Sequence, residues 1–166
     1  MKNWYYLLGK ASEGQVKALT TFPLLELARF YSYPIQINVE EGIDEIEIAD
    51  EDKIITGRFD IVAVDRARPT VNDVPFWILV IESKECGVEI RQALPQLLTY
   101  AYDSLKCQPS VWGLATNGLQ HLFVLVEQAD PPTYQLLPEL HLLEPERSIR
   151  LLQVLKAIGK QHFAAT

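Results

Sequence analysis

The chain has 166 residues, 48% of them hydrophobic, and a formal net charge of −7. This length and composition predict one domain, spanning residues 1–166, with a hydrophobic core. The acidic balance excludes the basic stripe of a tight non-specific nucleic-acid binder, and no apolar run approaches the roughly 18 residues that span a bilayer.

Targeting and cysteine signals point to the same compartment. The chain does not open with a basic segment followed by an apolar stretch, as a secretory signal would. Cys86 and Cys107 make neither a disulfide framework nor a CxxC metal site. We therefore expect a cytoplasmic protein with free thiols and no association with a membrane.

Helical signals come first along the chain. Ser12 and Gln15 are spaced as a capping box, and Thr21 with Pro23 is typical of a second helix start. We expect one or two helices, which end before Pro34.

Three strand-like runs follow, near residues 43–49, 59–64 and 76–83. The last of them, which includes the continuous apolar run 77–81, is predicted to be buried on both faces.

The first run belongs to an acidic ribbon, residues 40–52, which holds eight acidic residues and no basic one. The rest of the chain is therefore close to neutral, so local binding of nucleic acid is not excluded. The simplest interpretation of the ribbon is a solvated edge hairpin with Ile46 and Ile48 pointing inward and Glu45 and Glu47 outward.

The second half alternates helices and strands. Apolar spacing predicts a helix over 88–105, which Pro95 should kink or begin. Asn117-Gly118, between two apolar runs, predicts a hairpin. A short strand at 134–136 and a final apolar-faced helix around 151–158 close the chain. The order predicts an α/β fold with a mixed central β-sheet flanked by helices.

Charged residues gather where two of these strands should meet. If 59–64 and 76–83 pair antiparallel, the start of the first lies beside the end of the second, so Asp60 falls close to Glu82. Strand alternation places Lys84 on the face of Glu82 and Ser83 on the opposite face. Two carboxylates and one ammonium should therefore converge at one end of the sheet.

Such an arrangement has two interpretations. Neighbouring carboxylates repel unless a cation or a proton lies between them, and Mg²⁺ prefers oxygen ligands. A Mg²⁺ held by Asp60 and Glu82 would suit phosphodiester hydrolysis, with Lys84 beside it either to stabilise developing negative charge or, with a lowered pKa, to help remove a proton. The alternative is an ordinary ion-pair cluster at the rim of a sheet.

The following helix adds a polar stripe, because Gln92, Gln96 and Tyr100 recur at intervals of four residues. Metal binding by histidine finds no support, since His121 and His141, like the third histidine at 162, lack ligand spacing and are predicted at the surface or in turns.

With these motifs the sequence resembles the PD-(D/E)xK nuclease superfamily, and within it the N-terminal nuclease domain of type I restriction enzyme R subunits. GRFDIVAV, VIESK and QLLTY carry the resemblance, with LATNG after them, and it covers residues 26–127. The Q-x-x-x-Y motif of that lineage falls on Gln96 and Tyr100. The resemblance implies a restriction endonuclease-like fold and DNA as the substrate.

The resemblance also implies roles for the clustered residues. Asp60 and Glu82 would bind Mg²⁺, for which Mn²⁺ can substitute, and the backbone carbonyl of Ser83 would add a ligand. Lys84 would be the catalytic lysine.

The remaining roles concern two helices. Gln96 and Tyr100 would support the site or contact the DNA backbone. Members of the superfamily often contribute an acidic residue from the first helix, for which Glu26 is the candidate, although a solvated helix position explains Glu26 equally well.

Two functional hypotheses follow. The first is a stand-alone Mg²⁺-dependent DNA endonuclease domain, which acts as a homodimer or with a separately encoded partner protein. The second is a catalytically inactive protein of the same fold that serves as a binding module or scaffold.

Overall fold

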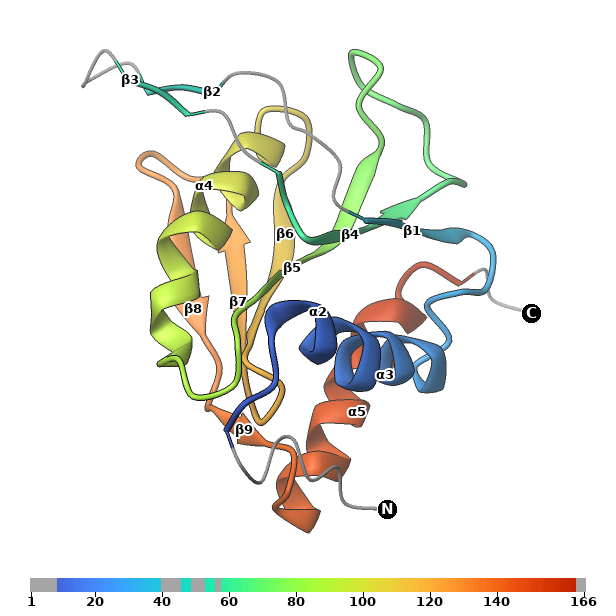
Figure 1. The fold of residues 1–166 in the computed structure, drawn as a ribbon. Helices are drawn as coiled ribbons and strands as arrows, with labels where there is room; N and C mark the ends of the chain where they lie inside the picture. The colour runs from blue at the N-terminus through green and yellow to red at the C-terminus, as the bar shows by residue number, and fades with distance from the viewer. Residues whose placement is uncertain (1–8, 40–45, 49–52, 56–57, 164–166) are drawn as a thin grey trace.

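The computed structural model describes residues 9–39, 46–48, 53–55 and 58–163. Its main sheet has the strand order β1-β4-β5-β6-β7-β8, with β9 beside β7 (Figure 1). The strands of this sheet are β1 (Ile35–Val39), β4 (Ile61–Asp65), β5 (Phe76–Ser83), β6 (Ser110–Thr116), β7 (Gln120–Glu127), β8 (Thr133–Leu136) and β9 (Leu140–His141).

The sheet is mixed, because β5 and β6 are parallel and the other neighbours are antiparallel. The helical segments are α2 (Glu13–Val16), the π-helical η1 (Lys17–Thr21), α3 (Phe22–Leu27), the 3₁₀ turn η2 (Ile90–Ala93), α4 (Leu94–Ser104) and α5 (Pro145–Lys160). None of the helices in the described residues is long and apolar enough to cross a membrane.

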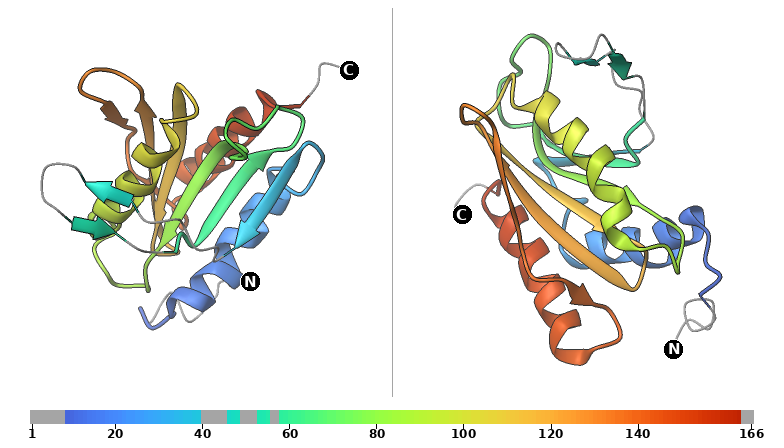
Figure 2. Two further views of the ribbon diagram at one scale, coloured as in Figure 1. Left: turned by 90° about the horizontal axis from the view of Figure 1, so that it is seen from above. Right: turned by 90° about the vertical axis from the view of Figure 1, so that its left-hand side faces the viewer.

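Helices cover both faces of the sheet, which confirms the predicted α/β class (Figure 2). On one face, Leu97 and Ala101 of α4 share a buried cluster with Val62 and Val80. On the other face, α3 and α5 contribute to a second cluster that contains Ile61. Strands β4 and β5 are therefore buried on both sides, as the continuous apolar run of β5 predicts.

The N-terminal helical region begins at the predicted capping box. The Ser12 and Gln15 side chains each accept a hydrogen bond from the other residue's backbone N–H, at 3.3 and 2.9 Å. As predicted, α3 begins after Thr21 with Pro23 in its first turn, but Thr21 forms no side-chain cap and is itself helical, because the chain runs on from η1 into α3. Pro23 has no backbone N–H to donate, and its ring crowds the preceding helical turn. The π-helical turn just before it is wider and leaves room for the ring.

Two turn predictions are confirmed. Pro95 lies in the first turn of α4 and so marks the true start of that helix, after η2. Asn117 and Gly118 join β6 to β7, where the Asn117 side chain accepts from the Leu119 and Gln120 N–H groups and Gly118 has φ +90°.

Other details of the sheet differ from expectation. Strand β1 was not predicted, although Ile35, Ile37 and Val39 alternate with polar residues along it. The described part of the acidic ribbon, β2 (Ile46–Ile48), pairs with β3 (Lys53–Ile55) in a separate two-stranded sheet rather than at an edge of the main one. The directions of the ribbon's side chains lie outside the described residues.

His121 corrects a further expectation. It lies on β7 opposite Thr116 and is 1% exposed, not at the surface or in a turn. Burial lowers the pKa of its imidazole to about 4, so the ring is neutral at pH 7. The neutral ring serves as part of the core.

Close packing of α4 on β6 generates a test of this fold. A Cβ at Gly113 would lie 2.7 Å from Val124 Cγ1 and 3.2 Å from Leu97, so Gly113→Ala should lower the free energy of unfolding by roughly 1–3 kcal/mol. Gly14→Ala is the matched control, because the nearest atom to its new Cβ lies 4.0 Å away and alanine favours a helix. Denaturant unfolding measures both, and equal stabilities for the two variants would contradict the described packing.

Candidate functional site

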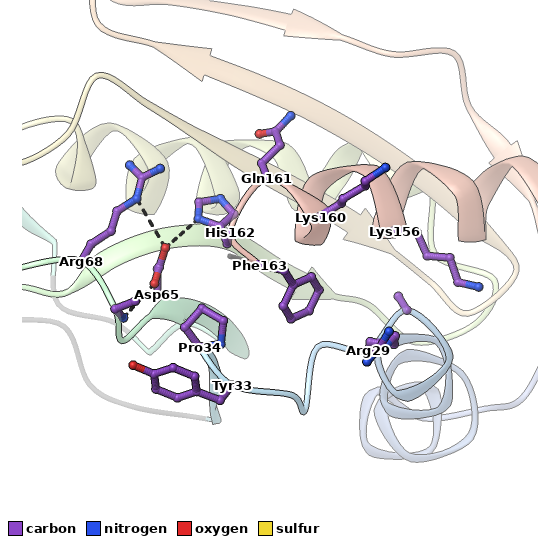
Figure 3. Close-up of a pocket in the computed structure, with 12 residues that line it drawn as sticks. Arg29, Tyr33, Pro34, Asp65, Arg68, Lys156, Lys160, Gln161, His162 and Phe163 are labelled. Carbon is purple, nitrogen blue, oxygen red and sulfur yellow. Dashed lines mark hydrogen bonds and ion pairs between the residues drawn. The ribbon is translucent and has the colours of Figure 1, made fainter. Parts of the chain in front are cut away.

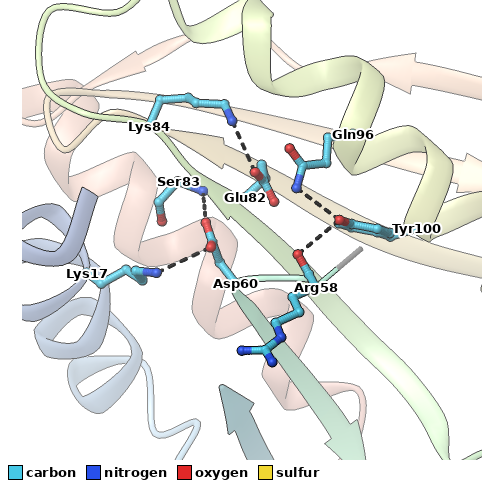
Figure 4. Close-up of polar contacts among 8 residues, drawn as sticks. All are labelled: Lys17, Arg58, Asp60, Glu82, Ser83, Lys84, Gln96 and Tyr100. Atoms are coloured by element: carbon cyan, nitrogen blue, oxygen red, sulfur yellow. Dashed lines mark hydrogen bonds and ion pairs between the residues drawn. The ribbon is translucent and has the colours of Figure 1, made fainter. Parts of the chain in front are cut away.

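The candidate site lies where β4 begins and β5 ends. Antiparallel pairing sets Ile61 opposite Ile81, which brings Asp60 beside the last residues of β5. Asp60 Oδ2 accepts a hydrogen bond of 2.6 Å from the Ser83 backbone N–H. The predicted convergence of Asp60 with the end of β5 is confirmed (Figure 4).

Glu82 is the most buried carboxylate of this site, with a side chain 3% exposed. Its Oε1 lies 3.2 Å from Lys84 Nζ, while its Oε2 is buried and has no hydrogen-bond partner among the described residues. Burial, together with the charge of Asp60, raises the pKa of Glu82 to about 7, although Lys84 acts in the opposite direction. Near pH 7 this side chain is therefore poised between its neutral and charged forms.

A second lysine, which the sequence did not single out, reaches the site from the first helical region. Lys17 Nζ lies 3.3 Å from Asp60 Oδ1, and the whole residue is only 8% exposed. Figure 4 shows Lys17 approaching Asp60 from the side away from Lys84. Each carboxylate thus has its own ammonium partner, Lys17 for Asp60 and Lys84 for Glu82.

This pairing changes the electrostatic balance expected from the sequence. Asp60, Glu82 and Lys84 alone would leave one excess negative charge, whereas the four-residue cluster with Lys17 is formally neutral. The signal that could have revealed Lys17 is a lysine within an otherwise apolar stretch of the first helix, one turn after Glu13.

The polar stripe on α4 is joined to the site through the start of β4. Gln96 Nε2 donates to the Tyr100 hydroxyl at 2.9 Å, and this hydroxyl donates to the Arg58 carbonyl at 2.9 Å. Tyr100 is 2% exposed, and burial raises its pKa, which keeps the hydroxyl protonated as a donor. The pair fixes the segment that leads into Asp60.

The stripe is shorter than the sequence suggested. Gln92 lies in η2 and is exposed, and Gln96 is also exposed apart from its bond to Tyr100. Only the phenol of the stripe is buried, so the amide of Gln96 keeps access to solvent.

Two acidic residues of the first helical region bear on the predicted metal site. Glu26 lies nine residues after Lys17, about 13 Å further along a helix, and its exposed carboxylate contributes to a raised pKa of Tyr31. Glu13 lies one turn before Lys17, and its charge contributes to the raised pKa of Glu82. Glu13 therefore acts electrostatically on the site, while Glu26 as a metal ligand stays a prediction.

Two carboxylates of the site are the potential ligands for a divalent cation. Within the described residues, no group of three or more histidine, cysteine, aspartate or glutamate side chains is arranged to hold a metal ion. Asp60 and Glu82 form a pair, and Mg²⁺ often takes one or two carboxylates and completes its shell with water. Together with the unpartnered Oε2 of Glu82, this pair fits Mg²⁺ or Mn²⁺. A bound ion requires the ammonium groups of Lys17 and Lys84 to move away from the carboxylate oxygens.

Comparison with known proteins finds a similarity to a solved structure. No protein-family model matches the chain, and no curated protein matches it. A solved structure with a TM-score of 0.46 and 18% sequence identity is a fragment of the protein assigned as an HsdR subunit of a type I restriction enzyme from Vibrio vulnificus YJ016. The match covers 87% of this chain and 26% of that one.

Neutralising Glu82 should change the pH dependence of stability. Its folded pKa of about 7 lies above the ordinary 4.5, so the stability linked to this group is fully present below pH 4.5 and is lost as pH rises through 7. Glu82→Gln keeps the shape and cannot ionise. Its free energy of unfolding should exceed that of wild type by a margin that grows from pH 4.5 to pH 8, towards roughly 3 kcal/mol.

The matched control is Glu85→Gln, an exposed position after β5 with the same change of charge. Its margin over wild type should stay near zero at every pH in denaturant melts with EDTA. His121 destabilises all three proteins as pH falls from 6.5 towards 4, so its effect cancels in the differences. Parallel stability curves for wild type and Glu82→Gln would contradict a buried carboxylate with a raised pKa.

Proposed function

We propose that this chain is a Mg²⁺-dependent DNA endonuclease domain with its active site at Asp60, Glu82 and Lys84. The observation that carries the proposal is the buried, unpartnered Oε2 of Glu82, on a carboxylate whose pKa is raised to about 7 by burial and by Asp60. Burying Glu82 next to Asp60 is electrostatically unfavourable, and a divalent cation between the two carboxylates would remove this unfavourable energy. The resemblance of the sequence motifs to PD-(D/E)xK nucleases supports the same chemistry.

In this proposal the acidic residues hold the cation. Asp60 and Glu82 supply carboxylate ligands, and the Ser83 backbone carbonyl and Glu26 are further candidates. When bound, Mg²⁺ would polarise the phosphodiester and lower the pKa of an attacking water. Mn²⁺ would serve in its place.

The lysines have separate tasks. Lys84 Nζ, 3.2 Å from Glu82 Oε1, is held where an ammonium can stabilise the negative charge that develops on the phosphate. Lys17 holds Asp60 in place before the cation arrives and reduces the repulsion between the two carboxylates.

Gln96 and Tyr100 support the reaction without contacting the cation. The Tyr100 hydroxyl is committed to the Arg58 carbonyl, so it positions the strand that presents Asp60. The exposed amide of Gln96 is free on its solvent side to contact the DNA backbone. In this proposal the domain acts as a homodimer or with a separately encoded partner protein.

One observation favours the second hypothesis, a catalytically inactive binding or scaffold protein. The two lysines already compensate both carboxylates, as in an ordinary ion-pair cluster. Under this alternative the four charges stabilise the end of the sheet and bind no metal ion. The two hypotheses make opposite predictions for Asp60.

Replacement of Asp60 by asparagine tests the proposal. Wild-type protein should cleave supercoiled or linear duplex DNA in Mg²⁺ or Mn²⁺ and not in EDTA, and Asp60→Asn should not cleave. The melting temperature of wild type should rise by about 5–10 °C when the ion exceeds its Kd about 100-fold, and that of the variant should not. Asp103→Asn, a partly exposed aspartate on α4, is the matched control and should behave as wild type.

The contrary result is equally concrete. If millimolar Mg²⁺ and Mn²⁺ leave the melting temperature of wild type unchanged, and Asp60→Asn lowers stability in EDTA, the carboxylate serves an ion pair with Lys17 and the inactive scaffold is the better account.

The exposed amide of Gln96 provides a further prediction. Gln96→Ala should lower the cleavage rate about tenfold or more, because it removes a contact to the DNA backbone and the restraint on Tyr100. Its free energy of unfolding should fall by less than about 0.5 kcal/mol, since the side chain is exposed. Gln92→Ala, one turn earlier and also exposed, is the control. Reduced stability with unchanged cleavage would make Gln96 a packing residue instead.

A further inference from the structure

A concave region lies at the other end of β4, remote from Asp60. This basic pocket has a volume of about 1140 Å³. Its walls are the end of α3, the turn at Tyr33 and Pro34, the loop that follows β4, and the last turns of α5 (Figure 3). Asp65 at the end of β4 lies in its wall, five residues or about 16 Å of strand from Asp60.

The pocket concentrates positive charge in an acidic chain. Among the described residues, four lysines and arginines line it, and Asp65 is the only acidic residue that does so. The four are Arg29, Arg68, Lys156 and Lys160, and they come from three separate segments. A chain of net charge −7 therefore has a local site that attracts anions.

The single acidic side chain does not cancel this charge for a ligand. Asp65 is 3% exposed, and its Oδ1 accepts the Ala67 N–H at 2.9 Å. Its Oδ2 lies 2.9 Å from His162 Nδ1 and 3.4 Å from Arg68 Nε. The carboxylate is thus buried and engaged, and it orients Arg68 and His162 at the pocket wall.

The other cations have no acidic partner among the residues that the structure describes. Within the described part of the chain, Arg29, Lys156 and Lys160 form no ion pair, and the Arg29 guanidinium lies 5.9 Å from the centre of the Phe163 ring. Lys160 in the last turn of α5 complements the helix dipole. That role does not account for Arg29 and Lys156, which lie outside that turn.

Aromatic surface accompanies the charge. Tyr33 is 80% exposed at the pocket wall, and Phe163 also lines it. Several cations spread over a wide opening suit a ligand with more than one phosphate charge, and an exposed aromatic ring suits a planar base. Nucleotides and nucleic-acid strands combine both features.

We propose that the basic pocket binds a nucleoside phosphate, either as a free nucleotide or as part of a nucleic-acid strand. This inference does not depend on the proposed nuclease function, because the pocket shares no residue with the site at Asp60 and Glu82.

Direct binding tests the proposal. Calorimetry on the full chain in EDTA would measure the affinity for ATP, for inorganic triphosphate and for a short single-stranded oligodeoxynucleotide. ATP binding tighter than triphosphate indicates a free nucleotide, and binding of the oligonucleotide alone indicates a nucleic-acid strand. Binding of none of the three at millimolar concentration would overturn the proposal, and equal binding of ATP and triphosphate would overturn its nucleoside part.

Two sets of variants locate the binding. Lys156→Gln with Lys160→Gln should weaken binding about tenfold or more. The matched control is Arg147→Gln with Arg150→Gln, on exposed positions of the same helix outside the pocket and with the same change of charge. It should change the affinity less than about twofold, since distant surface charges are screened. Equal losses in both double variants would show general charge attraction and overturn the assignment to the pocket.

Tyr33→Ala gives a readout that does not depend on the lysines. Loss of the ring should weaken binding of the base-containing ligand and leave triphosphate unaffected. Unchanged affinity for that ligand would remove Tyr33 as the base-binding surface and overturn the nucleoside part of the proposal.

Discussion

The hydrogen bond from the Ser83 N–H to Asp60 Oδ2, at 2.6 Å, ties the start of β4 to the end of β5, and the candidate site depends on it. It forms because antiparallel pairing with Ile61 opposite Ile81 leaves Asp60 at the rim, next to a backbone donor that needs an acceptor. The Tyr100 hydroxyl fixes the same segment from α4, through the Arg58 carbonyl. Together these bonds hold Asp60 beside Glu82 with little freedom to separate.

Holding the two carboxylates together has an electrostatic cost. A buried ionised carboxylate is unfavourable unless it is paired, and the pKa of Glu82 rises to about 7 in response. Lys17 and Lys84 offset much of this cost, one for each acid. Under the proposed function the cluster would have two states, one in which the ammonium groups neutralise both carboxylates and one in which a divalent cation replaces part of their charge.

The sequence predicted the parts of this site that depend on strand geometry. Alternation and antiparallel pairing were sufficient to bring Asp60 to Glu82 and Lys84, and the start of α4 followed from Pro95. Lys17 was missed, because the whole core decides which face of a helix packs on a sheet; its position in an otherwise apolar stretch was the one signal that the sequence offered. Strand β1 was overlooked despite its alternation, and the polarity of histidine wrongly suggested an exposed His121.

The most direct test of the central claim, a divalent cation between Asp60 and Glu82, is a crystal structure after a soak in Mn²⁺ with anomalous diffraction data. The account predicts an anomalous peak about 2.1 Å from carboxylate oxygens of both residues, with the ammonium of Lys17 moved away from Asp60. A map with no peak there, and with Lys17 and Lys84 still paired to the two carboxylates, would contradict the account.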